Sequence, residues 1–488
     1  MYTDFDDDDD YEADEREHQE GVRRAAQRTA PRKALAGIEV LPEYTFILES
    51  VKARKPAIFV TGKAGTGKST FIGYIMSQVA RSVVVAPTAI AALNVGGVTI
   101  HSFFGIPPRT LNSDEIAKPK PELINVIKNL DVLIVDEVSM VTPDIVDCIN
   151  NTLRAIGKKD QPFGGVPVVF VGDLLQLPPV IGRDVGTYYS QHYNTPNFYS
   201  AQVFQQVDII PVELTKVFRQ TDLEFIKALD CIRVGEGHQH VLSLFNARCG
   251  LPAGPAALNL VATNAAAQEV NDRELSKIDK PLKSYKSSSV GNFDTGASRL
   301  PAPEQLNLKV GSHVIFLKNE KDRAWVNGTL GQVVELRDTV IMVRILSTGD
   351  QVAVGRETWE KLQYRYDSKK KRIEAQKIGT FTQFPLALGW AVTIHKSQGM
   401  TLDAAHIDMG RGAFCTGQTY VALSRCRTLE GLTFNQRLTM ADIKVDGRVV
   451  DFYRQLRAAA ASVEAGGPDS GLSMQQQMEL EMGGSGGR

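Results

Sequence analysis

Apolar residues along the chain gather in short runs that alternate with segments of helical pattern. Four of these runs are rich in β-branched residues, at residues 57–61, 82–86, 132–135 and 166–171. Continuous apolar runs of this length indicate strands that are buried on both faces, and helices between them supply the crossovers of a parallel sheet. The first half of the chain therefore predicts an α/β domain.

The pattern changes twice in the second half of the chain. A further buried strand, at residues 258–262, continues the α/β style, whereas residues 306–372 carry short strand-like pieces with turn residues between them. That density of short strands is typical of a small all-β barrel. Apolar runs at residues 390–394 and 406–409 then return to the α/β pattern. We therefore predict a barrel that is inserted within a second α/β domain.

Polar and proline-rich stretches mark the borders of these regions. Residues 106–121 contain four prolines, and because proline cannot donate to a sheet ladder, we expect an exposed insertion there. We expect an acidic disordered tail at residues 1–36, a first domain at 37–205, a second domain at 206–304 and 386–462, the barrel at 305–385 and a disordered tail at 463–488.

The formal net charge of −1 conceals an asymmetry between the tail and the body of the chain. Residues 1–20 hold eleven acidic residues and one arginine, which leaves the other 468 residues with a net charge of +9. A basic body suits a polyanionic partner. The tail is predicted to be disordered and solubilising. A sharper hypothesis is that it folds over the basic groove and competes with nucleic acid.

Composition narrows the class of protein. No run approaches the 18 apolar residues of a membrane span, and the N-terminus is acidic where a secretion signal would be basic and then apolar. The five cysteines are odd in number and form no C-x-x-C pair, which favours thiols in a reducing compartment over a metal site. We expect a cytoplasmic protein, associated with the nucleoid if it is bacterial, and no membrane partner.

The chemistry of the first domain starts where its first strand ends. Residues 62–69 read GKAGTGKS and fit G-x-x-x-x-G-K-[ST], the phosphate-binding loop. Its glycines let backbone N–H groups turn toward the phosphates, Lys68 reaches the terminal phosphates and the Ser69 hydroxyl ligates Mg²⁺. The predicted nucleotide-binding residues are Gly62, Ala64, Gly65, Thr66, Gly67, Lys68, Ser69 and Thr70.

Two later strands end in residues suited to hydrolysis. Asp136 and Glu137 follow the strand at residues 132–135, at the sheet edge where the phosphate loop also opens. We expect Asp136 to hold Mg²⁺, usually through water, and Glu137 to polarise the attacking water. After the next strand, Gln176 has the donor and acceptor that sense a γ-phosphate or position a water.

Seven stretches then stand in a fixed order: GKAGTGKST, APTAIAALNVGGVTIHSFF, DEVSM, GDLLQLPPV, VFRQ, LGWAVTIHKSQGMTLD and YVALSRCRT. Together they resemble the superfamily-one 5′-to-3′ DNA helicases, and most of all the Pif-type family, with the RecD-like helicases next. The resemblance covers roughly residues 38–456. It implies two RecA-like motor domains with ATP between them and single-stranded DNA across their top.

The resemblance also assigns roles. Arg219 and Arg425 match two arginine fingers from the second motor domain, which neutralise charge on the γ-phosphate only when the cleft closes. Contacts with the DNA backbone, which bind without reading sequence, are implied for Pro87, Thr88, Ala89, His101, Ser102, Phe103, Thr393, His395, Lys396, Ser397 and Gln398.

Several assignments remain open at the level of sequence. Phe103 and Phe104 either stack on bases or pack inside the domain. Residues 106–121 are either a strand-separating wedge or an idle loop, and residues 369–372 are either a basic hairpin tip that touches duplex or a partner, or a solvated charge run. The family's adenine-reading glutamine is missing ahead of the phosphate loop, so Tyr44 stacks on the base or nucleotide selectivity is relaxed.

The expected function is that of an ATP-driven, Mg²⁺-dependent DNA helicase that translocates 5′ to 3′. Its expected partners are single-stranded DNA, DNA junctions or G-quadruplexes, with replication or repair proteins in genome maintenance, and we expect a monomer. The alternatives are an RNA or RNA:DNA-hybrid helicase and a nucleotide-switched binding module that does not hydrolyse productively.

Overall fold

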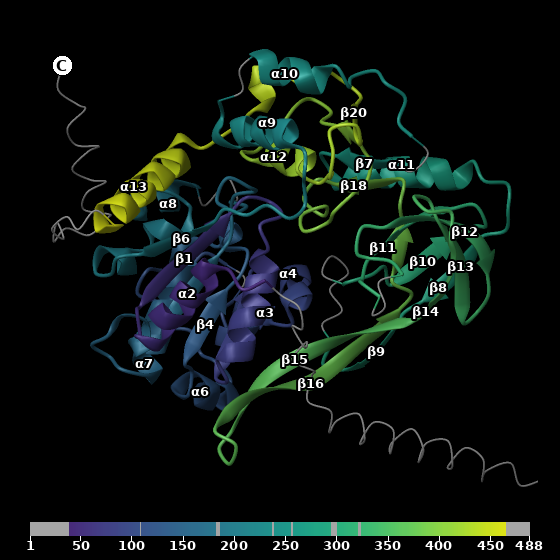
Figure 1. Cartoon of the computed structure of the whole chain (residues 1–488). Helices are drawn as coiled ribbons and strands as arrows, with labels where there is room; N and C mark the ends of the chain where they lie inside the picture. The colour runs from purple at the N-terminus through teal and green to yellow at the C-terminus, as the bar shows by residue number, and fades with distance from the viewer. Residues whose placement is uncertain are drawn as a thin grey trace, which may run out of the picture.

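The computed structural model describes residues 39–464, apart from residues 108, 182–185, 237–238, 255–256, 294–299 and 321–323. The predicted acidic tail lies outside the described residues, as does the predicted C-terminal tail from residue 465 on. Two parallel sheets and an antiparallel region make up the fold (Figure 1). Among the described helices, none is both long enough and apolar enough to cross a bilayer.

The first sheet has six strands in the order β3-β2-β4-β5-β1-β6, and every neighbouring pair is parallel. The four apolar runs of the first half are strands of this sheet, as predicted. The strands are β1 (Ala57–Gly62), β2 (Ser82–Ala86), β3 (Val98–Thr99), β4 (Val132–Val135), β5 (Val168–Val171) and β6 (Ile210–Leu214).

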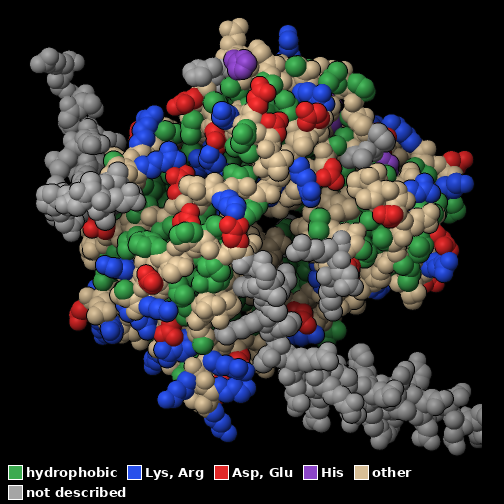
Figure 2. Space-filling model, in the orientation of Figure 1, with side chains coloured by type: hydrophobic (Ala, Val, Ile, Leu, Met, Phe, Trp, Pro, Cys, Tyr) green, Lys and Arg blue, Asp and Glu red, His purple; other side chains and the backbone are tan. Residues whose placement is uncertain are grey.

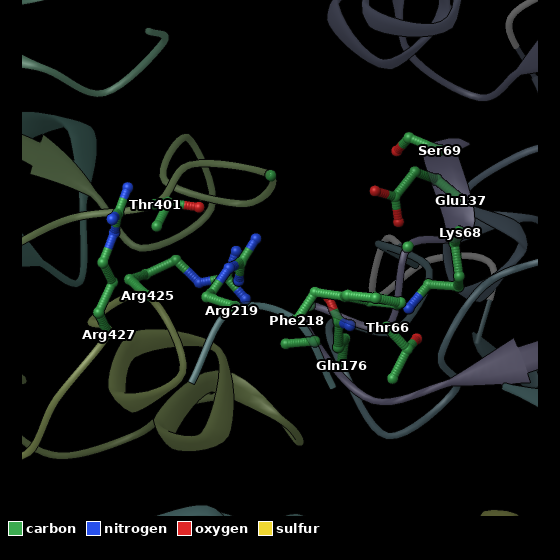
Figure 3. Close-up of a pocket in the computed structure, with 14 residues that line it drawn as sticks. Thr66, Lys68, Ser69, Glu137, Gln176, Phe218, Arg219, Thr401, Arg425 and Arg427 are labelled. Carbon is green, nitrogen blue, oxygen red and sulfur yellow. The ribbon is translucent and has the colours of Figure 1, made fainter. Parts of the chain in front are cut away.

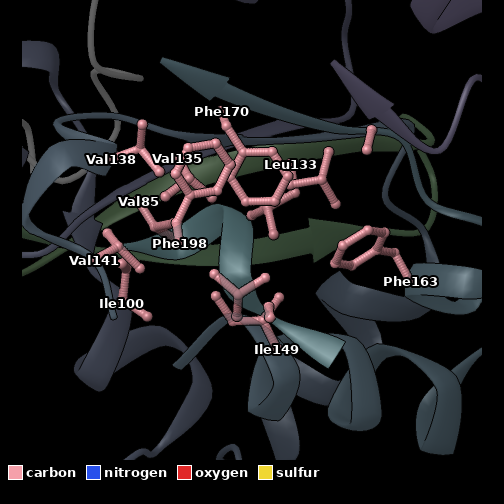
Figure 4. Packing of buried hydrophobic residues seen from close by; sticks show 14 of the residues in the cluster. Val85, Ile100, Leu133, Val135, Val138, Val141, Ile149, Phe163, Phe170 and Phe198 are labelled. Carbon is pink, nitrogen blue, oxygen red and sulfur yellow. The ribbon is translucent and has the colours of Figure 1, made fainter. Parts of the chain in front are cut away.

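Both faces of this sheet are covered, which explains why its strands are apolar without alternation. Phe59 and Leu133 point into one cluster, part of which Figure 4 shows, whereas Ile58 and Ile134 point into another. The surrounding helices are α2 (Pro42–Lys52), α3 (Lys68–Gln78), α4 (Ala89–Val95), α5 (Ile100–Phe104), α6 (Pro121–Lys128), α7 (Pro143–Ile156) and α8 (Gly186–His192), with 3-10 turns at Val138–Met140, Pro162–Gly165, Phe198–Ser200 and Gln202–Gln205.

The second sheet is also parallel, in the order β18-β7-β19-β20. Its strands are β7 (Leu258–Val261), β18 (Ala391–Thr393), β19 (Ala405–Asp408) and β20 (Leu432–Phe434), and its helices are α9 (Leu223–Val234), α10 (Gln239–Asn246), α11 (Asn264–Ser276) and α12 (Gln418–Leu423), with a 3-10 turn at Met440–Asp442. The chain thus has the mixed α/β fold with parallel sheets that is typical of RecA-like helicase domains.

The last helix, α13 (Gly447–Glu464), follows the second sheet in sequence but packs on the first. Phe452 stacks on Tyr199 with ring centroids 4.0 Å apart, and the Tyr453 hydroxyl lies 2.6 Å from that of Thr61. The sequence predicts that residues 386–462 belong to the second domain. The apolar face of α13 instead completes the core of the first sheet.

Between β7 and β18 the chain forms antiparallel sheets in the orders β14-β13-β12-β11-β17, β10-β8 and β15-β16-β9. Closure into a barrel stays a prediction, because β14 and β17 are edge strands in the pairings of the described residues. The antiparallel pairing begins before residue 305, at β8. The strands are β8 (Lys283–Lys286), β9 (Ser288–Gly291), β10 (Gln305–Leu308), β11 (His313–Phe316), β12 (Leu330–Leu336), β13 (Val340–Ile345), β14 (Gln351–Gly355), β15 (Glu357–Asp367), β16 (Arg372–Gln383) and β17 (Leu386–Leu388).

The hairpin of β15 and β16 reaches back to the first domain (Figure 1). Tyr364 is buried in the first core and its hydroxyl accepts a hydrogen bond from the Val84 amide over 3.4 Å, while Gln363 donates to Glu122 of α6 over 2.8 Å. Residues 369–371 form its exposed turn, where Figure 2 shows basic side chains at the bottom of this face. An exposed basic turn fits both alternatives, the tip that touches duplex or a partner and the solvated charge run.

The proline-rich segment at residues 106–121 contains no strand among its described residues, as expected. The expectation of an exposed insertion is only partly correct, because Leu111 and Ala117 are buried. Their amides donate to the Asp144 carboxylate and the Thr152 hydroxyl, each over 2.9 Å. Both acceptors belong to α7, so this helix holds the segment against the domain.

Candidate active site

The phosphate-binding loop joins β1 to α3, and its glycines are required by geometry. Gly65 and Gly67 have φ angles of +85° and +84°, a region that residues with a side chain rarely adopt. A Cβ atom on Gly65 would also lie 2.5 Å from the Cβ of Arg219. The loop is thus shaped for close approach by the segment that carries Arg219.

Lys68 is folded back onto the loop that it belongs to. Its Nζ donates to the carbonyl oxygens of Gly62 and Lys63, over 2.6 and 3.1 Å. Burial lowers the pKa of Lys68, because a charged amine loses hydration there. Phosphate oxygens that reach the loop would take the place of these two carbonyl oxygens as acceptors. Because phosphate oxygens are charged, their hydrogen bonds to the amine would be stronger.

A cavity of about 430 Å³ opens between the two sheets at this loop (Figure 3). Residues from both sides line it, so neither domain forms the site alone. The lining residues are Ala64, Gly65, Thr66, Gly67, Lys68, Ser69, Glu137, Gln176, Phe218, Arg219, Gly399, Thr401, Arg425 and Arg427.

Two carboxylates follow β4 at the edge of the first sheet. Burial and then the charge of Glu137 raise the pKa of Asp136 to about 7. Burial also raises the pKa of Glu137. Burial thus destabilises the anionic form of both carboxylates. A bound cation would restore that form, and a raised pKa also suits a carboxylate to accept a proton.

Gln398 connects this carboxylate pair to the second sheet. Its Nε2 donates to Oε2 of Glu137 over 3.1 Å and lies 3.5 Å from Oε1 of Gln176. Gln398 was predicted to contact DNA, but its amide points to the nucleotide side in this structure. The turn that follows β18 thus touches the two residues that were expected to handle the attacking water.

Two arginines from the far side of the cavity lie side by side (Figure 3). Arg219 donates to the carbonyl oxygen of Ser424 over 3.2 Å, and Nε of Arg425 donates to that of Val421 over 2.7 Å. Burial lowers the pKa of Arg219, and burial followed by the charge of Arg219 lowers the pKa of Arg425 to about 9. Adjacent cations, of which Arg425 is buried and Arg219 partly buried, favour an anionic ligand.

Phe218, Thr401 and Arg427 line the cavity but were missed by the sequence reasoning. Phe218 is 51% exposed, and its amide donates to the carbonyl of Gly65 over 2.9 Å. The sequence feature that could have indicated Phe218 is its position directly before Arg219. Thr401 and Arg427 lie inside the matched stretches LGWAVTIHKSQGMTLD and YVALSRCRT, but the resemblance assigned no role to either residue.

Some predicted nucleotide-binding residues do not reach the cavity. Tyr44 is 1% exposed, and its hydroxyl donates to the carbonyl of Gly67 over 3.4 Å, so the prediction that it stacks on a base is wrong. Its ring packs against Phe71 instead. Gly62, Thr70 and Asp136 are not among the lining residues either, although they belong to the loop and strand ends beside it.

The DNA-contact set of the first sheet divides between surface and core. Pro87, Thr88, Ala89, His101 and Ser102 are partly or fully accessible. Phe103 and its neighbour Phe104 are 1% and 0% exposed and pack edge to face with centroids 4.9 Å apart. The base-stacking reading of this pair is therefore wrong, because both rings belong to the core.

The set on the second sheet shows the same division. Thr393 and Ser397 are buried, where Thr393 accepts from the Lys396 amide over 3.2 Å and Ser397 donates to the Ile394 carbonyl over 2.8 Å. These hydroxyls shape the turn after β18. Lys396 is exposed, and His395 and Gln398 are partly exposed.

Comparison with known proteins identifies the group to which this fold and site belong. Residues 42–240 match the family model described as PIF1-like helicase. The chain is 33% identical over 442 residues to the human ATP-dependent DNA helicase PIF1, covering 87% of this chain and 65% of that protein. It is 31% identical over 433 residues to the ATP-dependent DNA helicase Pif1 of Bdellovibrio bacteriovorus, covering 86% of this chain and 92% of that protein.

Solved structures agree with these matches. The Pif1 of Bacteroides sp in complex with ADP-AlF4 has a TM-score of 0.80 and 37% identity, over 86% of this chain and 98% of that chain. The same protein bound to single-stranded DNA has a TM-score of 0.64 and 37% identity, over 87% and 98% of the two chains. Given these likenesses over most of its length, the chain belongs to the PIF1-like helicase family.

Proposed function

We propose that this chain is an ATP-dependent DNA helicase that moves 5′ to 3′ on single-stranded DNA and unwinds duplex or structured DNA. The hydrogen bond between Gln398 and Glu137, of 3.1 Å, carries the proposal. Gln398 sits three residues after His395 in a turn whose surface side chains suit a DNA backbone. That bond joins a strand-binding turn to the residue suited to activate water.

The family comparisons support the same function. The Bacteroides Pif1 binds ADP-AlF4 and single-stranded DNA in its crystal structures. This chain spans 65% of the length of its human relative, so the activity proposed here concerns the motor region that the two share.

The cavity suggests how its own residues handle ATP. Lys68 would exchange its loop carbonyls for the terminal phosphates, while Arg219 and Arg425 approach the γ-phosphate from the other domain. Glu137, with its pKa raised by burial, accepts a proton from the attacking water as Gln176 orients it. Loss of the γ-phosphate removes the anion that held the arginines, which lets the domains separate and the turn at Gln398 move.

The residues fit Mg²⁺ as a cofactor that is shared with the nucleotide. The Ser69 hydroxyl lines the cavity, and Asp136 with Glu137 supplies carboxylates whose raised pKa values a cation would reverse. Among the described residues no group of three or more His, Cys, Asp or Glu side chains could hold a metal alone. Such a site is typical of Mg²⁺, which binds through phosphates and few protein ligands and neutralises their charge.

The proposal also extends to features that rest on the sequence prediction. These are the domain borders apart from the place of α13 and the start of the antiparallel region, the closed β-barrel, a monomeric state, a cytoplasmic location, and action on junctions or G-quadruplexes with replication or repair proteins. The antiparallel sheets at residues 283–388 support a barrel of the predicted kind. The matched order of the seven sequence signatures supports the 5′-to-3′ polarity.

Unwinding of matched duplexes with 5′ or 3′ single-stranded tails tests activity and polarity together. We expect ATP-dependent unwinding of the 5′-tailed duplex only, and stronger stimulation of ATP turnover by DNA than by RNA of the same sequence. Glu137→Gln should bind ATP but lose turnover. Unwinding of the 3′-tailed duplex would contradict the polarity, and preference for RNA would favour the RNA helicase alternative. Lack of any turnover in the native chain would favour a nucleotide-switched binding module.

A further inference from the structure

The turn that follows β5 carries Gln176 and is held together by Asp173. Oδ1 of Asp173 accepts a hydrogen bond from the Leu175 amide over 3.2 Å, and its main-chain carbonyl accepts one from the Gln176 amide over 3.0 Å. The Leu174 amide donates to the hydroxyl of Tyr453 over 3.2 Å. These bonds fix the backbone that presents Gln176 to the cavity, so the direction of its side-chain amide depends on what that amide contacts.

The side-chain amide of Gln176 bonds to the carboxylate of the same aspartate. Its Nε2 donates to Oδ2 of Asp173 over 3.3 Å. A carboxylate can only accept hydrogen bonds, whereas an amide has one donating and one accepting end. An ionised Asp173 therefore holds the NH₂ group of Gln176 and leaves Oε1 to face away from it. On that side lies Nε2 of Gln398, which is 3.5 Å from Oε1 of Gln176 and 3.1 Å from Oε2 of Glu137.

Arg233 of α9 keeps Asp173 ionised and fixes the plane of its carboxylate. Nε of Arg233 donates to both carboxylate oxygens, over 3.3 and 3.2 Å, and Nη2 donates to Oδ1 over 2.8 Å. Burial by itself would raise the pKa of Asp173, but the charge and hydrogen bonds of Arg233 outweigh burial and hold that pKa below its usual value. The guanidinium lies over the ring of Tyr453, 5.3 Å from the ring centre, so its own position is fixed as well.

Arg233 reaches this turn from the second domain. Its helix, α9, begins at Leu223, shortly after Arg219 in the chain. One turn before Arg233 on the same helix, Asp230 forms an ion pair with Lys63 of the phosphate-binding loop, in which both side chains are about one-third exposed. The helix thus bonds to the first domain at two places. The Arg233 contact continues through Asp173 to Gln176, whereas the Lys63 contact involves a different part of the nucleotide site.

We propose that Arg233 is a positioning residue for hydrolysis, which acts through Asp173 to turn Oε1 of Gln176, rather than its NH₂ group, toward the attacking water. This inference rests on the proposed helicase function and decides between the two roles that the sequence left open for Gln176. The water donates one hydrogen bond to this amide oxygen, while Glu137 accepts its other proton. Because Arg233 belongs to the second domain, the orientation is complete only when α9 is docked against the first.

The first test measures ATP turnover by the full chain with a thymidine oligonucleotide. Arg233→Met together with Asp173→Asn leaves no unpaired charge, but the new amide at position 173 can meet Gln176 with either its donating or its accepting end. We expect kcat to fall roughly 100-fold, with the KM for ATP nearly unchanged. Arg233→Lys keeps the charge without the fork, so its kcat should lie between these values. Asp230→Asn, which breaks the neighbouring ion pair of α9, is the matched control and should keep the native kcat. A native kcat in the double variant would overturn the proposal.

A mutant cycle shows whether Arg233 acts through Gln176. Gln176→Ala removes the amide that is oriented, so adding either Arg233→Lys or the double substitution to it should lower kcat no further. A purely structural ion pair would instead lower kcat by the same factor with or without Gln176. That result would overturn the positioning role and leave the helicase function standing. If single-stranded DNA does not stimulate ATP turnover by the native chain, both the positioning role and the proposed function are overturned.

Discussion

The carboxylate of Asp173 and the guanidinium of Arg233 form an ion pair of 2.8 Å in which both side chains are almost fully buried. Asp173 follows β5 of the first sheet, whereas Arg233 belongs to α9 of the second. Asp173 also accepts a hydrogen bond from Nε2 of Gln176 over 3.3 Å. This pair therefore ties the two domains together directly beside the predicted γ-phosphate sensor.

Removing one partner of this pair should be costly. Arg233→Met leaves the Asp173 carboxylate buried without its cation, so we expect a loss of about 3–5 kcal/mol in the free energy of unfolding. The double variant with Asp173→Asn should recover part of that loss, because no uncompensated charge remains. Urea denaturation of the four proteins gives the coupling energy, and additive effects of the two substitutions would contradict a direct interaction.

Asp147 should make stability depend on pH in an unusual direction. Burial raises the pKa of this carboxyl from 3.8 to about 6, while its oxygens accept from the amides of Gln202 and Val203, each over 3.0 Å. The folded state therefore holds a proton that the unfolded state releases between these two values. The contribution of Asp147 to stability rises as pH falls from 7 to 4, by about 2 kcal/mol.

Comparison of the native chain with Asp147→Asn across this pH range measures that contribution. The free energy of unfolding of the native chain should increase relative to the variant as pH falls. A difference between the two proteins that does not change with pH would show that the carboxyl titrates normally.

Loss of either arginine at the cavity should slow hydrolysis far more than it weakens DNA binding. Arg219 and Arg425 are the cations that can meet charge on the γ-phosphate, and such residues are worth roughly 10³–10⁵ in turnover. We expect Arg219→Ala and Arg425→Lys to bind single-stranded DNA normally and to lose DNA-stimulated turnover. The lysine variant is chosen because Arg425 is 1% exposed. Unwinding that persists in either variant would exclude the arginine-finger role.

Phe218 should support the base of the nucleotide in place of Tyr44. Phe218→Ala should raise the KM for ATP roughly 2- to 10-fold, the usual worth of an aromatic contact, while Phe218→Tyr should retain it. Tyr44→Phe, which removes the hydrogen bond to Gly67, is the control and should leave KM nearly unchanged.

Because no glutamine precedes the loop to read adenine, GTP and ATP should be hydrolysed at comparable rates. Strong preference for ATP would contradict relaxed selectivity.

Deletion of residues 1–36 tests the hypothesis that the acidic tail competes with nucleic acid. The shortened chain should bind single-stranded DNA more tightly at low salt, and the difference should shrink as salt screens the charge of −10 on residues 1–20. Equal affinity of the two chains at low ionic strength would leave the tail a solubilising role only.

The wrong predictions from sequence concern the direction in which a side chain points from its helix or turn. Phe103 follows a motif that resembles a DNA contact, yet its ring completes the core with Phe104 and Tyr364. Gln398 stands among predicted DNA contacts and bonds to Glu137 instead. Neighbouring residues in a turn or in a single turn of helix point in different directions and so meet different surroundings. The local pattern of residues does not show which of them faces the core.

The sequence by itself determined the parts of this protein that depend on local order. Continuous apolar runs predicted the strands of the first sheet, and the glycine spacing at residues 62–69 predicted a loop that only glycine can form. Strand ends then predicted Asp136, Glu137 and Gln176 at one edge, because parallel strands share that edge. The roles of Arg219 and Arg425 were inferred from the family resemblance, because nothing in the neighbouring sequence distinguishes them from surface arginines.

Only the tertiary structure decided how distant segments meet. It closed the cavity with Phe218 and Arg427, buried Asp173 against Arg233, and laid α13 on the first core. It also set Phe414 against His395 across two loops. These contacts join residues far apart in the chain, and their energy comes from burial and charge pairing in the folded state, which a local pattern of residues does not contain.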